Sequence, residues 1–164
     1  MRYLKEFMFF SIIGFIFEKI VGLVMNSNFD SGILKGPYTP IYGIGILIII
    51  YGSDFIFKHL HLKRYQETII VIGLLFFTIT LLELLGGVLI ESIFHKVFWN
   101  YDSLKFNYGH YISLETSSIW TILGIIIYYF KDKLLKIPDK IPNIVCYCFV
   151  VIFIIDIVFT FITM

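Results

Sequence analysis

Charged residues are scarce in this chain. Only 15% of its 164 residues are Asp, Glu, Lys or Arg and 59% are hydrophobic, whereas soluble domains carry about 25% charged residues. The formal net charge is +1, so bulk charge gives no reason to expect a nucleic-acid partner. Alanine is absent while Ile, Phe and Tyr are frequent. This bias is typical of an AT-rich genome, and we expect a bacterial source.

Two common motifs for nucleotide binding and nucleophilic catalysis are also missing from the sequence. No G-x-x-x-x-G-K-[ST] loop is present to bind ATP phosphates, and no G-x-S-x-G sequence is present to supply a serine nucleophile. The two cysteines, Cys146 and Cys148, lie two positions apart in an apolar run, where helical residues do not share a face. We interpret them as small hydrophobic side chains rather than as a disulfide or a metal pair.

Long apolar runs are what the chain has instead. A helix needs about 20 apolar residues to cross a bilayer, and five candidates cover roughly residues 3–25, 40–58, 68–95, 111–131 and 142–163. The connecting segments are short, and no stretch remains for a soluble domain. We therefore predict an all-α polytopic membrane protein, with residues 1–164 forming one integral membrane domain in the bacterial cytoplasmic membrane. We expect no cleavable signal peptide, because the first apolar run is long and lacks a small-residue cleavage site.

Lysine and arginine set the predicted orientation, because these residues are enriched in cytoplasmic loops. Nine of them lie in the N-terminal segment and in loops 58–67 and 131–141, whereas only three lie in the alternate loops. The sequence therefore predicts five spans with the N-terminus inside and the C-terminus outside.

Two parts of the chain resemble each other. Each has a glutamate followed four residues later by glycine, Glu18 with Gly22 and Glu83 with Gly87, and each continues into an Asn-aromatic-Asp-Ser run, at 28–31 and 100–103. We interpret them as two parallel helix–loop–helix repeats, a known transporter plan. Chance matching of short motifs is the alternative. The predicted repeats cover about residues 3–58 and 68–131, and residues 142–163 form an extra fifth helix.

Acidic residues inside the predicted spans are the most informative feature. A carboxylate at the bilayer centre costs about 2.5–3.5 kcal/mol on insertion scales, so it faces a bundle interior, pairs or stays protonated. Glu18 and Glu83 share their helical stripes with small residues, which leave room for a neighbouring helix or a polar ligand. Both lie at similar depth in the outer half of the membrane. We expect an outward-facing polar site; the alternative is that each acid only bonds a hydroxyl across a helix interface. The candidates for a substrate or ion site are Glu18, Glu83, Glu91 and Glu115, together with Tyr38 and Tyr42. Asp54 and Asp156 are further acids in or beside spans.

The segment "GPYTPIYG" concentrates turn-forming residues between the first two spans. Its prolines cannot donate helical hydrogen bonds and push their predecessors towards extended geometry, and its glycines permit close backbone approach. Tyr38 and Tyr42 are best interpreted as membrane-interface anchors; the alternative is that they donate hydroxyls to Glu18 or to a ligand. The residues expected to shape this non-helical segment are Gly36, Pro37, Pro40 and Gly43.

Metal binding has little support in the sequence. Glu91 and His95 are spaced i, i+4 on one predicted helix, but a structural or catalytic site takes three or four ligands. We therefore predict no metal site and no cofactor.

The chain resembles the bacterial membrane family described as "putative ABC-transporter type IV", also called CmpB-like. The resemblance spans roughly the first 130 residues and rests on "GFIFEKIVG", "GPYTPIYGIG", "LLELLGGVLIE" and "WNYDSLKFNYGHYISLETSSIWTILG". It implies a permease-like role and a separate ATPase partner that would dock on the short basic cytoplasmic loops. The family usually has a Gly-Arg pair where this chain has Gly109 and His110, which puts a fixed cation there in doubt.

Three functions remain open from the sequence. The first is a transport component with a polar cavity around Glu18, Glu83 and Glu115. The second is an intramembrane enzyme acting on a lipid or envelope substrate, with paired carboxylates as acid and base; the missing nucleophile motif makes an enzyme the less favoured class. The third is an accessory membrane subunit without chemistry of its own.

Overall fold

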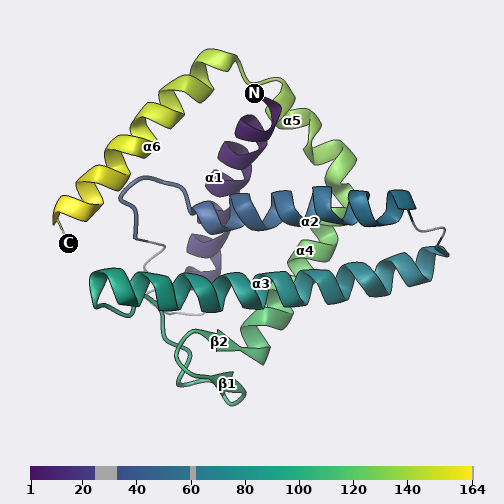
Figure 1. Cartoon of the computed structure of the whole chain (residues 1–164), viewed down its shortest axis with the longest axis horizontal. Helices are drawn as coiled ribbons and strands as arrows, with labels where there is room; N and C mark the ends of the chain where they lie inside the picture. The colour runs from purple at the N-terminus through teal and green to yellow at the C-terminus, as the bar shows by residue number, and fades with distance from the viewer. Residues whose placement is uncertain (25–32, 60–61, 164) are drawn as a thin grey trace. The chain divides into compact units, whose positions relative to one another are not determined.

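The computed structural model describes residues 1–24, 33–59 and 62–163. In these segments the chain is mostly helical, with one hairpin of two short strands, each two residues long (Figure 1). The elements are α1 (Arg2–Val24), α2 (Pro40–His59), α3 (Arg64–Phe94), β1 (Asn107–Tyr108), β2 (Ile112–Ser113), α4 (Leu114–Leu134), α5 (Lys136–Asp139) and α6 (Asn143–Thr163). The Asn-aromatic-Asp-Ser run of the first predicted repeat, at 28–31, lies outside the described residues.

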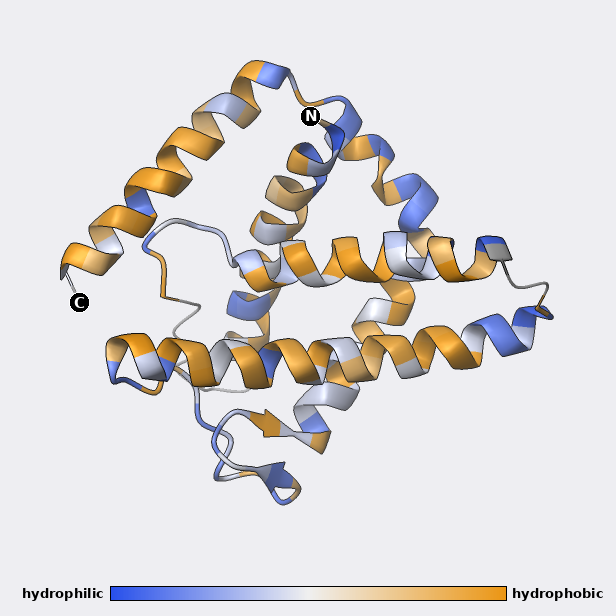
Figure 2. Cartoon of the chain, viewed as in Figure 1, coloured by the Kyte–Doolittle hydropathy of each residue, from blue (hydrophilic) through white to orange (hydrophobic). Residues whose placement is uncertain are grey.

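The predicted helical character is confirmed, and the five long helices fall on the five predicted apolar runs. Three of them are long and apolar enough to cross a membrane: Pro40–Lys58, Arg64–Phe94 and Asn143–Thr163. Figure 2 shows apolar residues on most turns of α6 and α3, and large apolar side chains such as Ile162 are exposed. A helix that is apolar all round fits a bilayer. The count of five spans and the N-in, C-out orientation stay predictions.

The chain divides into two compact units. One unit combines Met1–Ile44 with Leu135–Met164, and the other is Gly45–Leu134. Each unit has a buried apolar cluster of its own. The boundaries of the predicted repeats stay a prediction.

In the first unit, α1 packs with α5 and α6. Its buried apolar cluster is formed by Met8, Tyr38, Cys146 and Phe149. The Tyr38 ring lies edge-on to Phe149, with 5.4 Å between ring centroids, an arrangement that aromatic pairs favour. Both cysteines are free thiols, and Cys146 fills core space as a small apolar side chain. The described residues just before α2 therefore contribute to this core through Tyr38.

In the second unit, α3 and α4 form the main helix pair, around Ile49, Val71 and Leu75. His95 ends α3 in a left-handed conformation, with φ 53°, and its N–H donates to the Glu91 carbonyl at 2.8 Å. The chain then returns to α4 through the short antiparallel pair of β1 and β2, in which Asn107 faces Ser113. The segment from 95 to 113 therefore begins at the end of α3 that carries Glu83 and Glu91.

Candidate functional site: carboxylates held by loop donors

Two glutamates of α3 each receive a tyrosine hydroxyl from the segment that comes after the helix. Tyr101 donates to Glu83 Oε1 at 3.3 Å, and Tyr111 donates to Glu91 Oε2. The two glutamates are eight positions apart, which places them about two turns apart along the helix. Both tyrosines are buried, at 7% and 8% exposure. The carboxylates are therefore met by polar partners although they lie on an apolar helix.

Gly87 lies on the same helix between the two glutamates, beneath the Tyr111 ring. A Cβ placed on Gly87 would stand 2.3 Å from Tyr111 Cδ1, a separation that packed atoms do not adopt. Trp99 Nε1 also donates to the Tyr111 carbonyl at 3.1 Å. The absence of a side chain at Gly87 thus lets the tyrosine approach close enough to reach Glu91.

Glu115 lies in the first turn of α4. Its Oε1 accepts the backbone N–H of Phe106 at 3.1 Å, and its Oε2 is buried without a hydrogen-bond partner among the described residues. An acidic side chain at this position is stabilised by the positive end of the helix dipole. Glu115 therefore fixes the loop before β1 to the start of α4.

Glu18 has a corresponding partner in the first unit. Thr39 Oγ1 donates to Glu18 Oε2 at 3.3 Å, and the Thr39 N–H donates to the Ser11 carbonyl of α1 at 2.9 Å. The loop before α2 is thus fastened to α1 at two levels. Glycines permit this contact: a Cβ on Gly14 would stand 2.4 Å from the Tyr42 ring, and one on Gly43 would stand 2.3 Å from Ser11 Oγ.

The loop-shaping residues have distinct places. Pro40 is the first residue of α2, a position where proline suits a helix because its missing N–H would have no partner there. Gly36 packs against the Tyr38 ring, since a Cβ there would stand 2.3 Å from Tyr38 Cε1. Pro37 is exposed between them. Among the described residues, 33–39 form the non-helical stretch that leads into α2.

The position of Tyr38 is not that of a membrane-interface anchor, the interpretation favoured from the sequence. It is 3% exposed, and its hydroxyl donates to Asp156 Oδ2 of α6 at 2.6 Å. Burial, together with this hydrogen bond, raises the pKa of Tyr38 above its ordinary value, so the hydroxyl remains a donor at neutral pH. The sequence marks Asp156 as an acid within a span, but not as a candidate for the predicted site.

The four predicted acids are divided between the two units. Glu18 lies in the first unit, whereas Glu83, Glu91 and Glu115 lie in the second. The convergence of Glu18 and Glu83 on one cavity therefore stays a prediction. Within the segments that the structure describes, no group of three or more His, Cys, Asp or Glu side chains is arranged to hold a metal ion.

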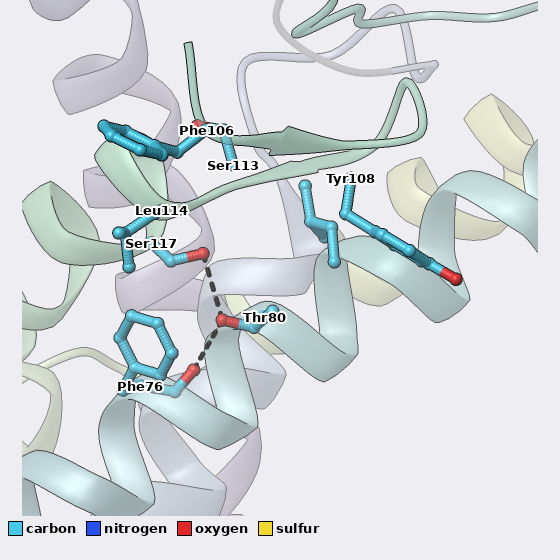
Figure 3. A pocket seen from close by; sticks show the side chains of 8 residues that line it. Phe76, Thr80, Phe106, Tyr108, Ser113, Leu114 and Ser117 are labelled. Atoms are coloured by element: carbon cyan, nitrogen blue, oxygen red, sulfur yellow. Dashed lines mark hydrogen bonds between the residues drawn. The ribbon is translucent and has the colours of Figure 1, made fainter. Parts of the chain in front are cut away.

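A small cavity of about 160 Å³ lies between α3, the hairpin and α4. Figure 3 shows Thr80 of α3 at this cavity, next to Ser117 of α4. The Thr80 hydroxyl oxygen lies 2.7 Å from the Phe76 carbonyl of its own helix and 3.0 Å from Ser117 Oγ, and the second contact links α3 to α4. Aromatic and aliphatic side chains form most of the remaining wall. Further along α4, Lys131 pairs with Asp54 of α2. Polar contacts thus tie α4 to the other helices of its unit at several levels.

Apolar helices of membrane-spanning length define a membrane protein. The chain belongs to the family described as "Putative ABC-transporter type IV", whose sequence profile matches residues 6–161. The match confirms the resemblance seen in the sequence and extends it through α6. Neither the comparison with curated proteins nor that with solved structures finds a match.

Proposed function

We propose that the chain is a permease-like, multi-pass subunit of a bacterial cytoplasmic membrane transporter, with an outward-facing polar site built around its intramembrane carboxylates. The observation that supports this most is the pair Glu83 and Glu91, each engaged by a tyrosine from the same segment. A carboxylate in a membrane helix is costly and marks ion or substrate pathways. The family description supports transport as the class of activity.

An ATPase partner is suggested by the family description and is part of the proposal. The chain has no phosphate-binding loop of its own, so a separate subunit would supply ATP hydrolysis. The test is to purify the chain from its native membranes and to measure ATP hydrolysis by the proteins that copurify at fixed stoichiometry. We expect hydrolysis that falls in the Glu83→Gln variant. A homogeneous complex that lacks ATPase activity would contradict this part.

The polar site has a test of its own. In a background with Cys146→Val and Cys148→Ser, we expect Glu91→Cys to react with a membrane-impermeant cationic thiol reagent added from outside. Leu89→Cys is the matched control, because Leu89 lies on the same helix, is 60% exposed and is predicted to face lipid. If folded Glu91→Cys reacts as slowly as Leu89→Cys, there is no water-accessible site at Glu91.

One observation favours an accessory subunit as the second candidate. Glu18, Glu83, Glu91 and Glu115 each bond a nearby loop, as they would if they served assembly alone, and hydrogen bonds between membrane helices average about 0.6 kcal/mol. In that case Glu83→Gln would lower the yield or thermal stability of the chain and leave the ATP hydrolysis per folded complex unchanged. The two candidates are therefore separated by one variant and two measurements.

A further inference from the structure

Three donors of one short loop meet the carboxylate of Asp156. The backbone N–H of Lys35 donates to Oδ1 at 3.1 Å, the backbone N–H of Gly36 donates to Oδ2 at 2.8 Å, and the Tyr38 hydroxyl donates to Oδ2 at 2.6 Å. The aspartate comes 120 residues after Gly36 in the chain. We name these two N–H groups and the hydroxyl the loop cradle.

The loop cradle has the chemistry of an anion site. Successive backbone N–H groups form a concavity that binds anions, and hydrogen bonds to a charged acceptor are stronger than neutral ones. Glycine at position 36 allows this arrangement, because a Cβ there would collide with the Tyr38 ring. Lys35 adds a positive charge beside the donors. The arrangement contains donors and a cation, so its ligand is an anion.

An open surface depression of about 290 Å³ adjoins the loop cradle. Lys35, Gly36, Tyr38 and Asp156 line its polar side, and three apolar residues of α6 line the remainder. Asp156 itself is 8% exposed. A ligand that carries one carboxylate on a short apolar body would match both walls. This combination is distinct from the glutamates of α3, whose carboxylates receive tyrosine hydroxyls from another segment.

We propose that the loop cradle is a binding site for small monocarboxylate anions, and that Asp156 fills it as an internal ligand in this structure. The two oxygens of a free carboxylate would take the positions of Oδ1 and Oδ2 when the Asp156 side chain is withdrawn. The assignment stands on contacts within the first unit, so it does not depend on the transport site proposed for Glu83 and Glu91.

Chemical rescue tests the assignment. In Asp156→Ala the loop cradle is vacated, and sodium acetate should raise the thermal midpoint in a saturable way, by about 2–4 °C at roughly five times its dissociation constant. Sodium chloride at the same ionic strength should not. Acetate should have little effect on the wild type, whose site is filled, or on Asp54→Ala, which removes an aspartate outside the loop cradle. Adding Tyr38→Phe to Asp156→Ala should reduce the rescue.

The assignment is overturned if folded Asp156→Ala has the same thermal midpoint in acetate as in chloride. If the alanine variant is unfolded in chloride, purification in acetate should recover it. If neither salt recovers it, Asp156→Ser decides, because the shorter polar side chain leaves the position of the carboxylate open to acetate. A folded serine variant with the same midpoint in both salts would then reject the site.

Discussion

Replacing Gly87 by alanine should destabilise the chain far more than a glycine-to-alanine change in a helix normally does. The new methyl carbon would stand 2.3 Å from Tyr111 Cδ1 and 2.5 Å from its Cγ, so the ring must move. Overpacking of this kind costs about 1–3 kcal/mol. Movement of the ring also removes the tyrosine hydroxyl from Glu91. We expect the thermal midpoint to fall by about 2–12 °C, since each kcal/mol shifts it by about 2–4 °C at this chain length.

Gly73→Ala is the matched control, because it lies on the same helix and, apart from its chain neighbours and the local helix backbone, no atom lies within 4 Å of its Cβ position. Alanine is favoured over glycine in a helix by about 0.8–1.0 kcal/mol, so this variant should keep or raise the midpoint. The assay is tryptophan fluorescence during heating in detergent, with Trp99 as a local reporter through its bond to the Tyr111 carbonyl. Equal midpoints for the two variants would refute the reasoning from close packing.

Three further outcomes are expected. Gly14→Ala should destabilise by a similar amount, because its Cβ would meet the Tyr42 ring at 2.4 Å; a chain as stable as the wild type in the same heating assay would contradict this. Asp54→Asn and Lys131→Gln should each change the free energy of unfolding by only about 0–1 kcal/mol, as the loss of an exposed ion pair does. A double-mutant cycle measures the coupling energy between the two residues, and a value above about 2 kcal/mol would contradict this prediction. Tyr38→Phe should lower the midpoint by an amount that is constant from neutral pH to about pH 10 and that shrinks above pH 10. The reason is that the pKa of this hydroxyl is raised in the folded chain, so its stabilisation is lost only once the hydroxyl ionises in the unfolded chain. A difference between the variant and the wild type that changes between pH 6 and 8 would point to another group.

The long helices could be predicted from the sequence because their apolar runs are long and uninterrupted. The run starting at residue 40 becomes α2 from Pro40, and the last run becomes α6 from Asn143. The helix α3 begins at Arg64, earlier than the expected residue 68, because a polar first turn adds no hydropathy and is invisible to that criterion. The four-residue α5 and the two-residue strands are too short to produce any period.

The polar contacts could be predicted only by residue type. The stripe of Glu83, Gly87 and Glu91 is given by helical spacing, and the structure places all three at the tyrosines of the next segment. The partner of Tyr38 could not be found in this way, because Asp156 lies 118 positions away and no local pattern links the two. The signal was present as a single aspartate in a very apolar helix, which requires a partner but does not identify it.

The contact between Asp156 and residues 35–38 also sets an order of events during synthesis. The ribosome delivers the N–H groups of Lys35 and Gly36 to the membrane long before it delivers the aspartate that accepts them. Until α6 has been inserted, those groups must be satisfied by water, because an unpaired amide in hydrocarbon is costly. The nascent chain therefore completes its first unit only with its last helix, and a chain arrested after α5 would present the same three donors without their carboxylate.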